Sequence, residues 1–488
     1  MKYSYKDGGL VLGLIVFFIL LIFPVSDEPV ASRMAAIAVL MGIWWMTEAL
    51  PLAATSLVPL LLFPLLGIIN ATETAKEYFN STIAIYIGGF LIALSMQRWD
   101  LHRRLALKTI LVIGKGPSGI VLGFMIASAF ISMLISNVAT TVMLLPIGMA
   151  IILKVEESFK SEITKEFSLS LMLGIAYAAS IGGVATLIGT APNLIFKRIY
   201  EMNFPEAGEI TFGSWFLFGF PIAMIMLALA WIVLTKILYK PSPELVMNND
   251  VIREEYKLLG KMAFEEKMVA IIAGMTALLW LTRTNLEIGE LMLPGWGQLL
   301  PFVDMIDDAT IAIFSGLLLF IIPAKKRPHR LSQDTVFMKI PWDVILIFGG
   351  GFALAKGFTV SGLSEVIGSV LTGITDIHPL ILTLTVCLLL TFLTELTSNT
   401  ATTNTVLPIL AAAAIAGGIN PLYLMLPATL SASFAFMLPV ATPPNAIVYG
   451  SGKIKVEQMM KAGIVLNLIG VLVITGMFKL FGTSVFGN

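Results

Sequence analysis

A short polar motif occurs twice in this 488-residue chain, which is otherwise very apolar. The first copy is SNVATT at residues 136–141, and the second is SNTATT at residues 398–403. Their amide and hydroxyl groups can hydrogen-bond to a carboxylate and still release it. A buried Arg would bind an anion more tightly and would cost more to insert into a membrane. The motif therefore predicts a binding patch for a small anion in each half of the chain.

A second pair of motifs follows the two copies. GTAPN at residues 189–193 and ATPPN at residues 441–445 each interrupt an apolar run. Proline breaks helical hydrogen bonding, and a broken helix at membrane depth is tolerated only beside a cavity or inside the protein. Each break frees carbonyl groups that suit a hard monovalent cation and N–H groups that suit an anion.

Flanking landmarks repeat with the same offset as the polar motif. GGF occurs at residues 88–90 and 350–352, and Leu-Pro occurs at 145–146 and 407–408. Ser and Thr are also common packing residues between membrane helices, and one copy alone would be interpreted in that way. Because each copy is followed by a Pro-Asn break, the pattern favours a duplicated membrane unit with a site where the two halves meet.

The composition is that of a helical membrane protein. The chain is 57% hydrophobic and 13% charged, whereas soluble domains carry about 25% charged residues. Apolar runs of about 17–25 residues recur along the chain, each long enough to cross a bilayer, and they lack the alternation of a β-barrel. A net charge of zero gives no case for nucleic-acid binding. Cys387 is the only cysteine, so an internal disulfide or a cysteine-based metal site is excluded.

The predicted fold is an all-α polytopic membrane protein with two inverted-topology repeats, about 11 transmembrane helices and two re-entrant hairpins. Residues 1–240 form the first repeat, 241–266 a cytoplasmic linker with a short amphipathic helix, and 267–488 the second repeat. The hairpins lie near 118–153 and 379–417, with a Ser-Asn motif at each tip. The spans are predicted at 9–24, 31–49, 51–69, 81–97, 168–200, 212–236, 267–282, 309–323, 342–360, 420–450 and 462–482.

The distribution of Lys and Arg predicts the orientation in the cell membrane. With the N-terminus in the cytoplasm, most of these residues fall in inside segments, including the loop 98–117, in agreement with the positive-inside rule. The C-terminus is then external. The first hairpin would enter from the cytoplasm and the second from outside.

At its motifs the chain resembles the divalent anion–sodium symporter family of di- and tricarboxylate transporters. The resemblance spans nearly the whole chain and is strongest at TELTSNT (residues 394–400) and FMLPVATPPNAI (residues 436–447). It implies a homodimer in which each protomer has a scaffold domain and a mobile transport domain, with an elevator-type mechanism.

The resemblance also implies a set of site residues. Two sodium sites would be formed by Ser132, Ser136, Asn137 and Gly189, and by Thr394, Thr397, Asn399 and Ala441. The hairpin tips and the two breaks would bind the substrate through Ser136, Asn137, Val138, Ser398, Asn399, Thr400, Pro192 and Pro444. The chain departs from the family at Val138, where a Thr is usual, so one hydroxyl is missing from the first tip.

The expected function is secondary transport of C4 and C5 dicarboxylates such as succinate, malate, fumarate and 2-oxoglutarate. With no ATP-binding motif, transport would run on gradients, without a cofactor other than sodium as a coupling ion. Val138 favours exchange of one dicarboxylate for another. The alternative is sodium-coupled symport of a dicarboxylate or citrate, because a dianion needs charge compensation and the tips carry no fixed cation.

Two other classes of protein compete with this interpretation. A membrane-embedded hydrolase would need a base or a metal pair inside the bilayer, and no His falls in the core of a predicted span. An ion channel is disfavoured by the inverted repeats. Two acidic residues also stand out: Glu395 is expected to hold the second hairpin in shape or to carry a proton, and Glu48 to be a structural residue at a membrane boundary.

Overall fold

The computed structural model describes residues 5–245, 250–288, 291–326, 329–370, 378–482 and 485–486, and these are almost entirely helical. The predicted all-α class is confirmed. The exception is a small antiparallel hairpin, β1 (Leu286–Ile288) paired with β2 (Leu291–Leu293), which was not predicted.

The first half of the chain contains the helices α1 to α12 and two short irregular helices. They are α1 (Tyr5–Ile22), α2 (Pro29–Thr47), α3 (Leu52–Thr55), α4 (Val58–Leu65), α5 (Ala71–Lys76), α6 (Ser81–Arg98), α7 (Leu101–Ile113), α8 (Gly116–Ser132), α9 (Asn137–Ser158), α10 (Ser161–Val184), α11 (Ala191–Asn203), η1 (Pro205–Ala207), α12 (Phe212–Ile232) and η2 (Val233–Leu238).

The second half follows a surface helix, α13 (Asp250–Leu258). Its helices are α14 (Phe264–Leu281), η3 (Trp296–Leu299), η4 (Val303–Met305), α15 (Asp308–Ile321), η5 (Asp334–Lys339), α16 (Trp342–Val360), α17 (Leu363–Val370), α18 (Pro379–Leu393), α19 (Asn399–Gly417), α20 (Leu422–Ser433), α21 (Pro443–Tyr449), α22 (Val456–Met477) and η7 (Phe478–Gly482).

Several predicted boundaries are wrong. The single span expected at 51–69 is two short helices, α3 and α4, because Pro51, Pro59 and Pro64 punctuate this stretch. The expected loop at 98–117 contains the helix α7, and α17 was not predicted as a separate element. The runs 168–200 and 420–450 are each divided into two helices, as their internal Pro-Asn motifs predicted.

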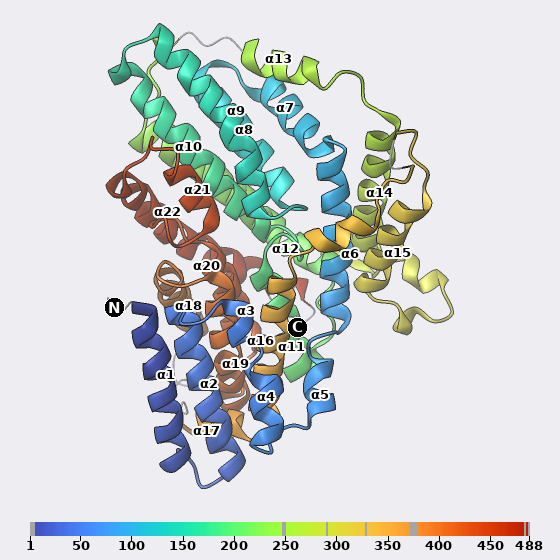
Figure 1. Ribbon diagram of the computed structural model, residues 1–488, viewed down its shortest axis with the longest axis vertical. Helices are drawn as coiled ribbons and strands as arrows, with labels where there is room; N and C mark the ends of the chain where they lie inside the picture. The colour runs from blue at the N-terminus through green and yellow to red at the C-terminus, as the bar shows by residue number, and fades with distance from the viewer. Residues whose placement is uncertain are drawn as a thin grey trace.

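The same order of elements occurs in both halves. In the first half, α6 is followed by a helical hairpin (α8 and α9), a broken helix (α10 and α11) and a long helix (α12). In the second half, the corresponding elements are α16, the hairpin of α18 and α19, the broken helix of α20 and α21, and α22. Figure 1 draws the first hairpin in the upper part of the molecule, and α16 and α19 in its lower part. Opposite membrane orientation of the two repeats stays a prediction.

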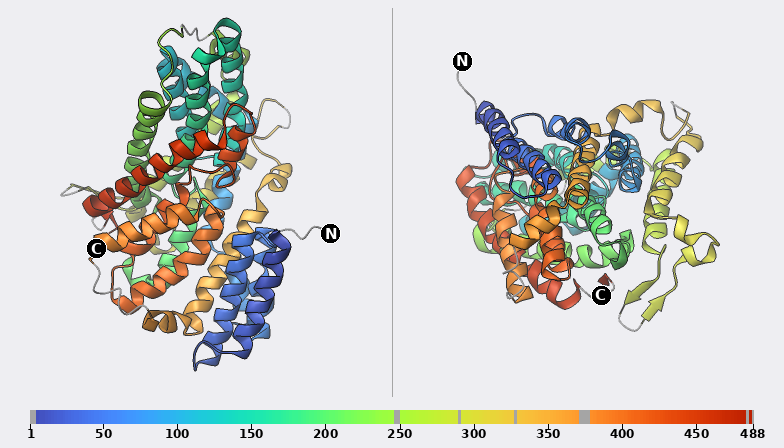
Figure 2. Two further views of the ribbon diagram at one scale, coloured as in Figure 1. Left: turned by 90° about the vertical axis from the view of Figure 1, so that its left-hand side faces the viewer. Right: turned by 90° about the horizontal axis from the view of Figure 1, so that it is seen from below.

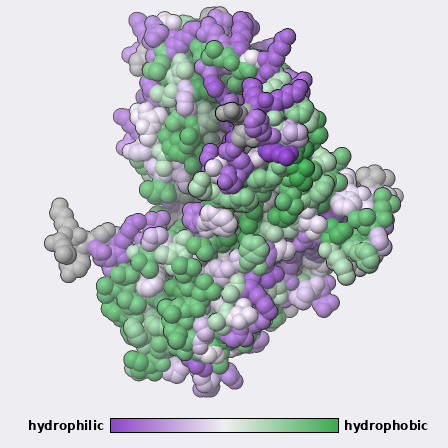
Figure 3. All heavy atoms as spheres, turned by 45° about the vertical axis from the view of Figure 1, so that its right-hand side comes forward, coloured by the Kyte–Doolittle hydropathy of each residue, from purple (hydrophilic) through white to green (hydrophobic). Residues whose placement is uncertain are grey.

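Within the described residues, eight helical segments are long and apolar enough to cross a membrane. Five shorter apolar helical segments accompany them: Leu52–Leu65 (α3 and α4 taken together), Gly116–Ser132, Asp308–Ile321, Pro379–Leu393 and Leu422–Ser433. Figure 3 shows broad hydrophobic areas on the lower part of one face, with hydrophilic residues gathered at the top. Large apolar side chains such as Phe18 and Leu61 are more than half exposed, as expected for surfaces in contact with lipid. The chain is an integral membrane protein.

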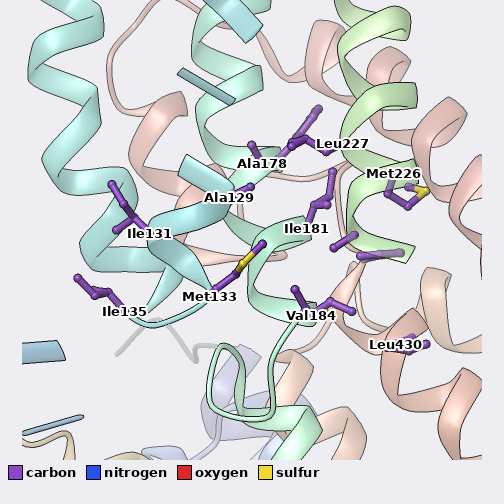
Figure 4. Packing of buried hydrophobic residues seen from close by; sticks show 14 of the residues in the cluster. Ala129, Ile131, Met133, Ile135, Ala178, Ile181, Val184, Met226, Leu227 and Leu430 are labelled. Atoms are coloured by element: carbon purple, nitrogen blue, oxygen red, sulfur yellow. The ribbon is translucent and has the colours of Figure 1, made fainter. Parts of the chain in front are cut away.

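The first hairpin is held by a closely packed core. Ala129 and Met133 from α8 and its tip face Ala178 and Ile181 of α10 (Figure 4). The backbones come close here, because a side chain at Gly182 of α10 would overlap the backbone at Ala129. The whole apolar stretch of α10 is buried, so the first hairpin packs against a helix that is itself enclosed by protein. In the second hairpin, Cys387 of α18, the only cysteine of the chain, is also fully buried.

The segment between the halves is held by charged contacts. The short amphipathic helix predicted within 241–266 is α13, and its Glu255 pairs with Arg103 of α7. The next residue of α7, Arg104, is buried and pairs with Glu266 of α14 at 2.5 Å. The described residues 250–266 are therefore tied to α7 by ion pairs at both ends of this stretch. Figure 2 gives two further views of these elements.

Candidate functional site

One cavity of about 770 Å³ is lined by both hairpin tips and by both helix breaks. The two copies of the polar motif are 262 residues apart in the sequence and meet here. Ten of the residues expected to form the site line the cavity: Ser136, Asn137, Val138, Gly189, Thr397, Ser398, Asn399, Thr400, Ala441 and Pro444.

Three other expected residues lie behind the cavity wall. Ser132 and Thr394 are fully buried at the ends of α8 and α18, where each contacts the Asn of its own tip. Pro192 is buried at the start of α11. These three residues are therefore placed to shape the site rather than to line it.

The first tip is formed by a tight turn between α8 and α9. Ser136 is the N-cap of α9, and its hydroxyl accepts a hydrogen bond from the backbone N–H of Ala139 at 3.3 Å. The Ser132 hydroxyl donates to the Asn137 side-chain oxygen at 2.5 Å. Thr141 donates to the Asn137 carbonyl at 2.8 Å. Asn137 is thereby held in one orientation at the mouth of the turn.

The second tip repeats the contacts to the Asn, with a Thr in place of Ser132, whereas Ser398 makes no capping hydrogen bond of the kind made by Ser136. The Thr394 hydroxyl donates to the Asn399 side-chain oxygen at 2.6 Å, and Thr403 donates to the Asn399 carbonyl at 2.7 Å. Two further hydroxyls, on Thr397 and Thr402, lie 2.6 Å apart beside this turn. Both tips thus present an Asn that is fixed by a hydroxyl five residues earlier.

The Pro-Asn breaks also match each other. The Asn193 amide donates to the carbonyls of Gly183 and Thr186, at 3.3 and 2.7 Å. The Asn445 amide donates to the carbonyls of Ala435 and Leu438, at 3.1 and 3.0 Å. Each amide thus crosses the break and satisfies carbonyls released where the preceding half-helix ends. The side-chain oxygens of Asn193 and Asn445 are buried and have no hydrogen-bond partner among the described residues.

Helix N-termini converge on the cavity. The first residues of α9, α11 and α19 line it, and the short helix α21 begins there too. The free N–H groups and the positive end of the helix dipole at such starts favour an anion. The cavity therefore has an electrostatic preference for a negative ligand although the tips carry no charged side chain.

Oxygen atoms gather beneath the first tip. Gly183 of α10 lies against the Asn137 side chain and the Gly189 backbone. A Cβ added at Gly183 would be 2.6 Å from the Asn137 side-chain oxygen and 3.1 Å from the Gly189 carbonyl oxygen. Amide, hydroxyl and carbonyl oxygens are ligands that suit hard cations. The orphan oxygen of Asn193 belongs to a side chain that itself contacts Gly183. The oxygen atoms available as ligands in this half therefore fit a sodium ion.

Gly183→Ala tests how tightly this oxygen cluster is built. The added methyl group would displace Asn137 from the turn, and overpacking of this kind costs about 1–3 kcal/mol, so we expect uptake to fall by roughly five- to 150-fold. Uptake into proteoliposomes is the measurement. Gly274→Ala in α14 is the matched control, because nothing lies within 4 Å of its added methyl group. Equal uptake by both variants would contradict the tight packing inferred at Gly183.

Glu395 has a structural position behind the second tip. Its carboxylate is buried and accepts hydrogen bonds from the backbone N–H groups of Phe436, Met437 and Leu438, at 2.7, 2.9 and 3.0 Å. The Asn467 amide of α22 donates to it at 2.7 Å. The carboxylate thus ties the hairpin to the loop before α21 and to α22, as the structural interpretation of Glu395 predicted.

The apolar residues of the cavity wall were not predicted from the sequence. Its apolar part includes Tyr86 and Phe90 of α6, whose rings are 4.8 Å apart, together with Val344 and Val440. Tyr86, Phe90 and Val344 resemble ordinary packing residues of spanning helices, so only their position in space distinguishes them. Val440 lies in the loop before α21, within the motif at residues 436–447. An apolar wall beside polar tips suits a ligand with a short carbon chain between charged ends.

Glu48, expected to be a structural residue at a membrane boundary, has a further position that the sequence did not predict. Glu48 lines the cavity and pairs with Lys6 of α1, whose Nζ lies 3.1 Å from its carboxylate. The Glu48 backbone is left-handed at the end of α2, with φ 47°. Lys6 and Glu48 are the only charged residues among the described residues that line the cavity. Their charges cancel, so the lining carries no net charge.

Two solved structures resemble the whole molecule. The Alcanivorax borkumensis YdaH transporter aligns with a TM-score of 0.57 and 12% identity, covering 98% of this chain and 99% of that one. Neisseria gonorrhoeae MtrF, titled as illuminating a class of antimetabolite efflux pumps, aligns with a TM-score of 0.56 and 11% identity, covering 97% and 94%. At such low identity, these similarities concern the fold alone.

Sequence comparison gives closer relatives. A protein of Staphylococcus saprophyticus named sodium-dependent dicarboxylate transporter SdcS is 43% identical over 483 residues, covering 96% of this chain and 91% of the relative. The protein of the same name in Staphylococcus aureus is 41% identical over 475 residues, covering 96% and 89%. The family model described as the sodium:sulfate symporter transmembrane region matches residues 6–487. The resemblance found in the motifs is thus confirmed, and the chain belongs to this family of membrane transporters rather than to the enzymes.

Proposed function

We propose that this protein carries C4 and C5 dicarboxylates, such as succinate, malate, fumarate and 2-oxoglutarate, across the membrane together with sodium. The main support is the cavity in which two uncharged tips and the starts of several helices meet. Neutral donors and helix N-termini at these places can hold the two carboxylates of one small acid. The two staphylococcal relatives are named dicarboxylate transporters, which agrees with a dicarboxylate substrate.

Charge balance favours sodium coupling. The paired Lys6 and Glu48 leave the lining neutral, so no net side-chain charge offsets the two negative charges that a bound dianion brings into a membrane-embedded site. Sodium ions held by the oxygens beneath each tip would offset this charge. In this proposal they are held by Ser132, Ser136, Asn137 and Gly189 in the first half, and by Thr394, Thr397, Asn399 and Ala441 in the second.

The preference for exchange drawn from Val138 has weaker support. The relatives are named as sodium-dependent, which favours the symport alternative. Val138 lines the cavity and is 39% exposed, so the missing hydroxyl removes one contact from the first tip. The second tip keeps its hydroxyl at Thr400, and the Ser hydroxyl and Asn amide of the motif are present in both tips.

The proposed movement is an elevator. The two hairpins and the two broken helices would move together as a transport domain and carry the filled site past the remaining scaffold helices. The proposal includes a homodimer in the cell membrane, with a cytoplasmic N-terminus and an external C-terminus.

Uptake of labelled succinate into proteoliposomes tests the proposal. One set of vesicles has an inward sodium gradient and no internal substrate, and the other is preloaded with dicarboxylate and kept free of sodium. We expect accumulation in the first set, abolished when choline replaces sodium. Uptake confined to the second set would show that exchange, not sodium symport, is the activity. Competition by malate, fumarate, 2-oxoglutarate and citrate ranks the substrates.

A further inference from the structure

A second cavity, of about 440 Å³, lies apart from the transport site. It is formed between the C-terminal end of α6 and the segment 332–339, which contains η5 and leads into α16. It therefore joins an element of the first half to an element of the second. The indole N–H of Trp99 fixes this junction by donating to the Leu331 carbonyl at 2.9 Å.

The charge of this cavity is positive. Arg98 and Lys339 are its charged lining residues, and no described acidic residue lines it. Neither forms an ion pair with a described carboxylate; the Arg98 guanidinium instead lies over the Trp99 ring, 5.7 Å from its centroid. The remaining polar lining groups are neutral. The Ser95 hydroxyl already donates to the Leu91 carbonyl at 2.9 Å, and the Gln333 amide donates to the Thr335 hydroxyl at 3.1 Å, so the donors left for a ligand are those of Gln97, Ser332 and Thr335 and the second N–H of Gln333. This combination suits a phosphate group, which takes hydrogen bonds from Arg and Lys and accepts more from hydroxyl and amide donors.

The position of the cavity along the helices indicates its depth. The apolar helix α6 ends at Arg98, and the apolar helix α16 begins at Trp342. The cavity thus lies where two spanning helices leave the hydrocarbon region, which is the level of lipid headgroups.

Exposed apolar side chains lie directly beside the cationic groups. Phe337, Met338 and Trp342 are 45%, 78% and 47% exposed. The Trp342 indole donates to the Phe337 carbonyl at 2.9 Å, and the Phe337 ring stacks on Phe320 of α15. Aromatic residues of this kind are typical of the membrane interface. A phosphate in the cavity could therefore be continuous with acyl chains that lie along these side chains.

We propose that this cavity binds the headgroup phosphate of an anionic membrane phospholipid. Arg98 and Lys339 hold the phosphate from two sides, and the hydroxyl and amide groups of the cavity bond its remaining oxygens. Because the two cations come from different halves of the chain, the lipid links α6 to the start of α16. Basic pockets between membrane helices are a common way to recognise lipid headgroups.

The test uses the full-length protein in detergent, with phosphatidylglycerol and phosphatidylcholine as probes. We expect native mass spectrometry to show retained phosphatidylglycerol, and its addition to raise the melting temperature more than phosphatidylcholine does. In the variant Arg98→Gln/Lys339→Gln, the phosphatidylglycerol concentration needed for half of this shift should rise at least about tenfold.

A matched control removes two positive charges elsewhere. Lys108→Gln/Lys240→Gln changes two exposed lysines outside the cavity and should leave phosphatidylglycerol binding unchanged. The single variant Lys339→Gln, at an exposed position, gives a milder test if the double variant is unstable. Equal phosphatidylglycerol binding by the Lys339→Gln variant and the unchanged protein would overturn the proposal. Equal protection by inorganic phosphate would also overturn it, because the site would then take a soluble anion.

Discussion

Asn137→Ala or Asn399→Ala is expected to reduce dicarboxylate uptake by about 100-fold or more. Each substitution removes a side chain that lines the cavity and is fixed by a hydroxyl five residues earlier. In the proposed function each Asn serves both the anion and a sodium ion. Hydrogen bonds to charged groups contribute about 1.5–3 kcal/mol each, and about 1.4 kcal/mol corresponds to a tenfold change, so losing two such contacts gives the expected effect. The measurement is the initial rate of succinate uptake into proteoliposomes.

Two controls separate loss of the site from loss of the fold. Val142→Ala and Ile409→Ala lie on the same helices, α9 and α19, at exposed positions away from the cavity. They should transport at nearly the unchanged rate. All four variants should elute as a single species in size-exclusion chromatography and melt within a few degrees of the unchanged protein. Normal uptake by both Asn variants would remove the tips from the mechanism.

Glu395→Ala is expected to lower stability strongly and to abolish transport. The substitution leaves three backbone N–H groups and the Asn467 amide without their acceptor in a buried place. An unsatisfied buried donor costs about 1–3 kcal/mol, so the expected loss exceeds about 3 kcal/mol in total. The loop before α21 would then no longer be held against the second hairpin. Thermal melting in detergent and the uptake rate are the two measurements.

Glu395→Gln and Asn467→Ala refine this experiment. The Gln side chain has nearly the same shape and keeps one acceptor oxygen, so we expect a smaller loss of stability and partial transport. Asn467→Ala removes one donor and leaves the three backbone contacts in place, so its loss should also be smaller. If Glu395→Gln kept full stability but lost all transport, a proton-carrying role would replace the structural one.

Much of the site could be predicted from the sequence, because polar motifs are conspicuous in an apolar chain. The repetition of Ser-Asn at 136 and 398 predicted that distant segments come together, and both line one cavity. The Pro-Asn motifs predicted the positions of both helix breaks. These predictions succeeded because uncharged polar groups and prolines inside a membrane need a specific structural reason.

Other parts could not be predicted, for physical reasons. Tyr86, Phe90 and Val344 look like any apolar residue of a spanning helix until their neighbours are known. The helix α7 is short and carries Arg103, Arg104 and Lys108, so its sequence resembles a polar loop. Its stability comes from partners far along the chain, such as Glu255 and Glu266, and periodicity carries no information about such contacts.

The burial of Cys387 has a practical consequence for following the proposed movement. It is the only thiol in the chain and is 0% exposed, so the natural sequence already serves as a background for site-directed labelling. A single reporter introduced by Val138→Cys would place its probe at the cavity wall. A membrane-impermeant maleimide, added to one compartment at a time, would then report from which side the aqueous path reaches that position.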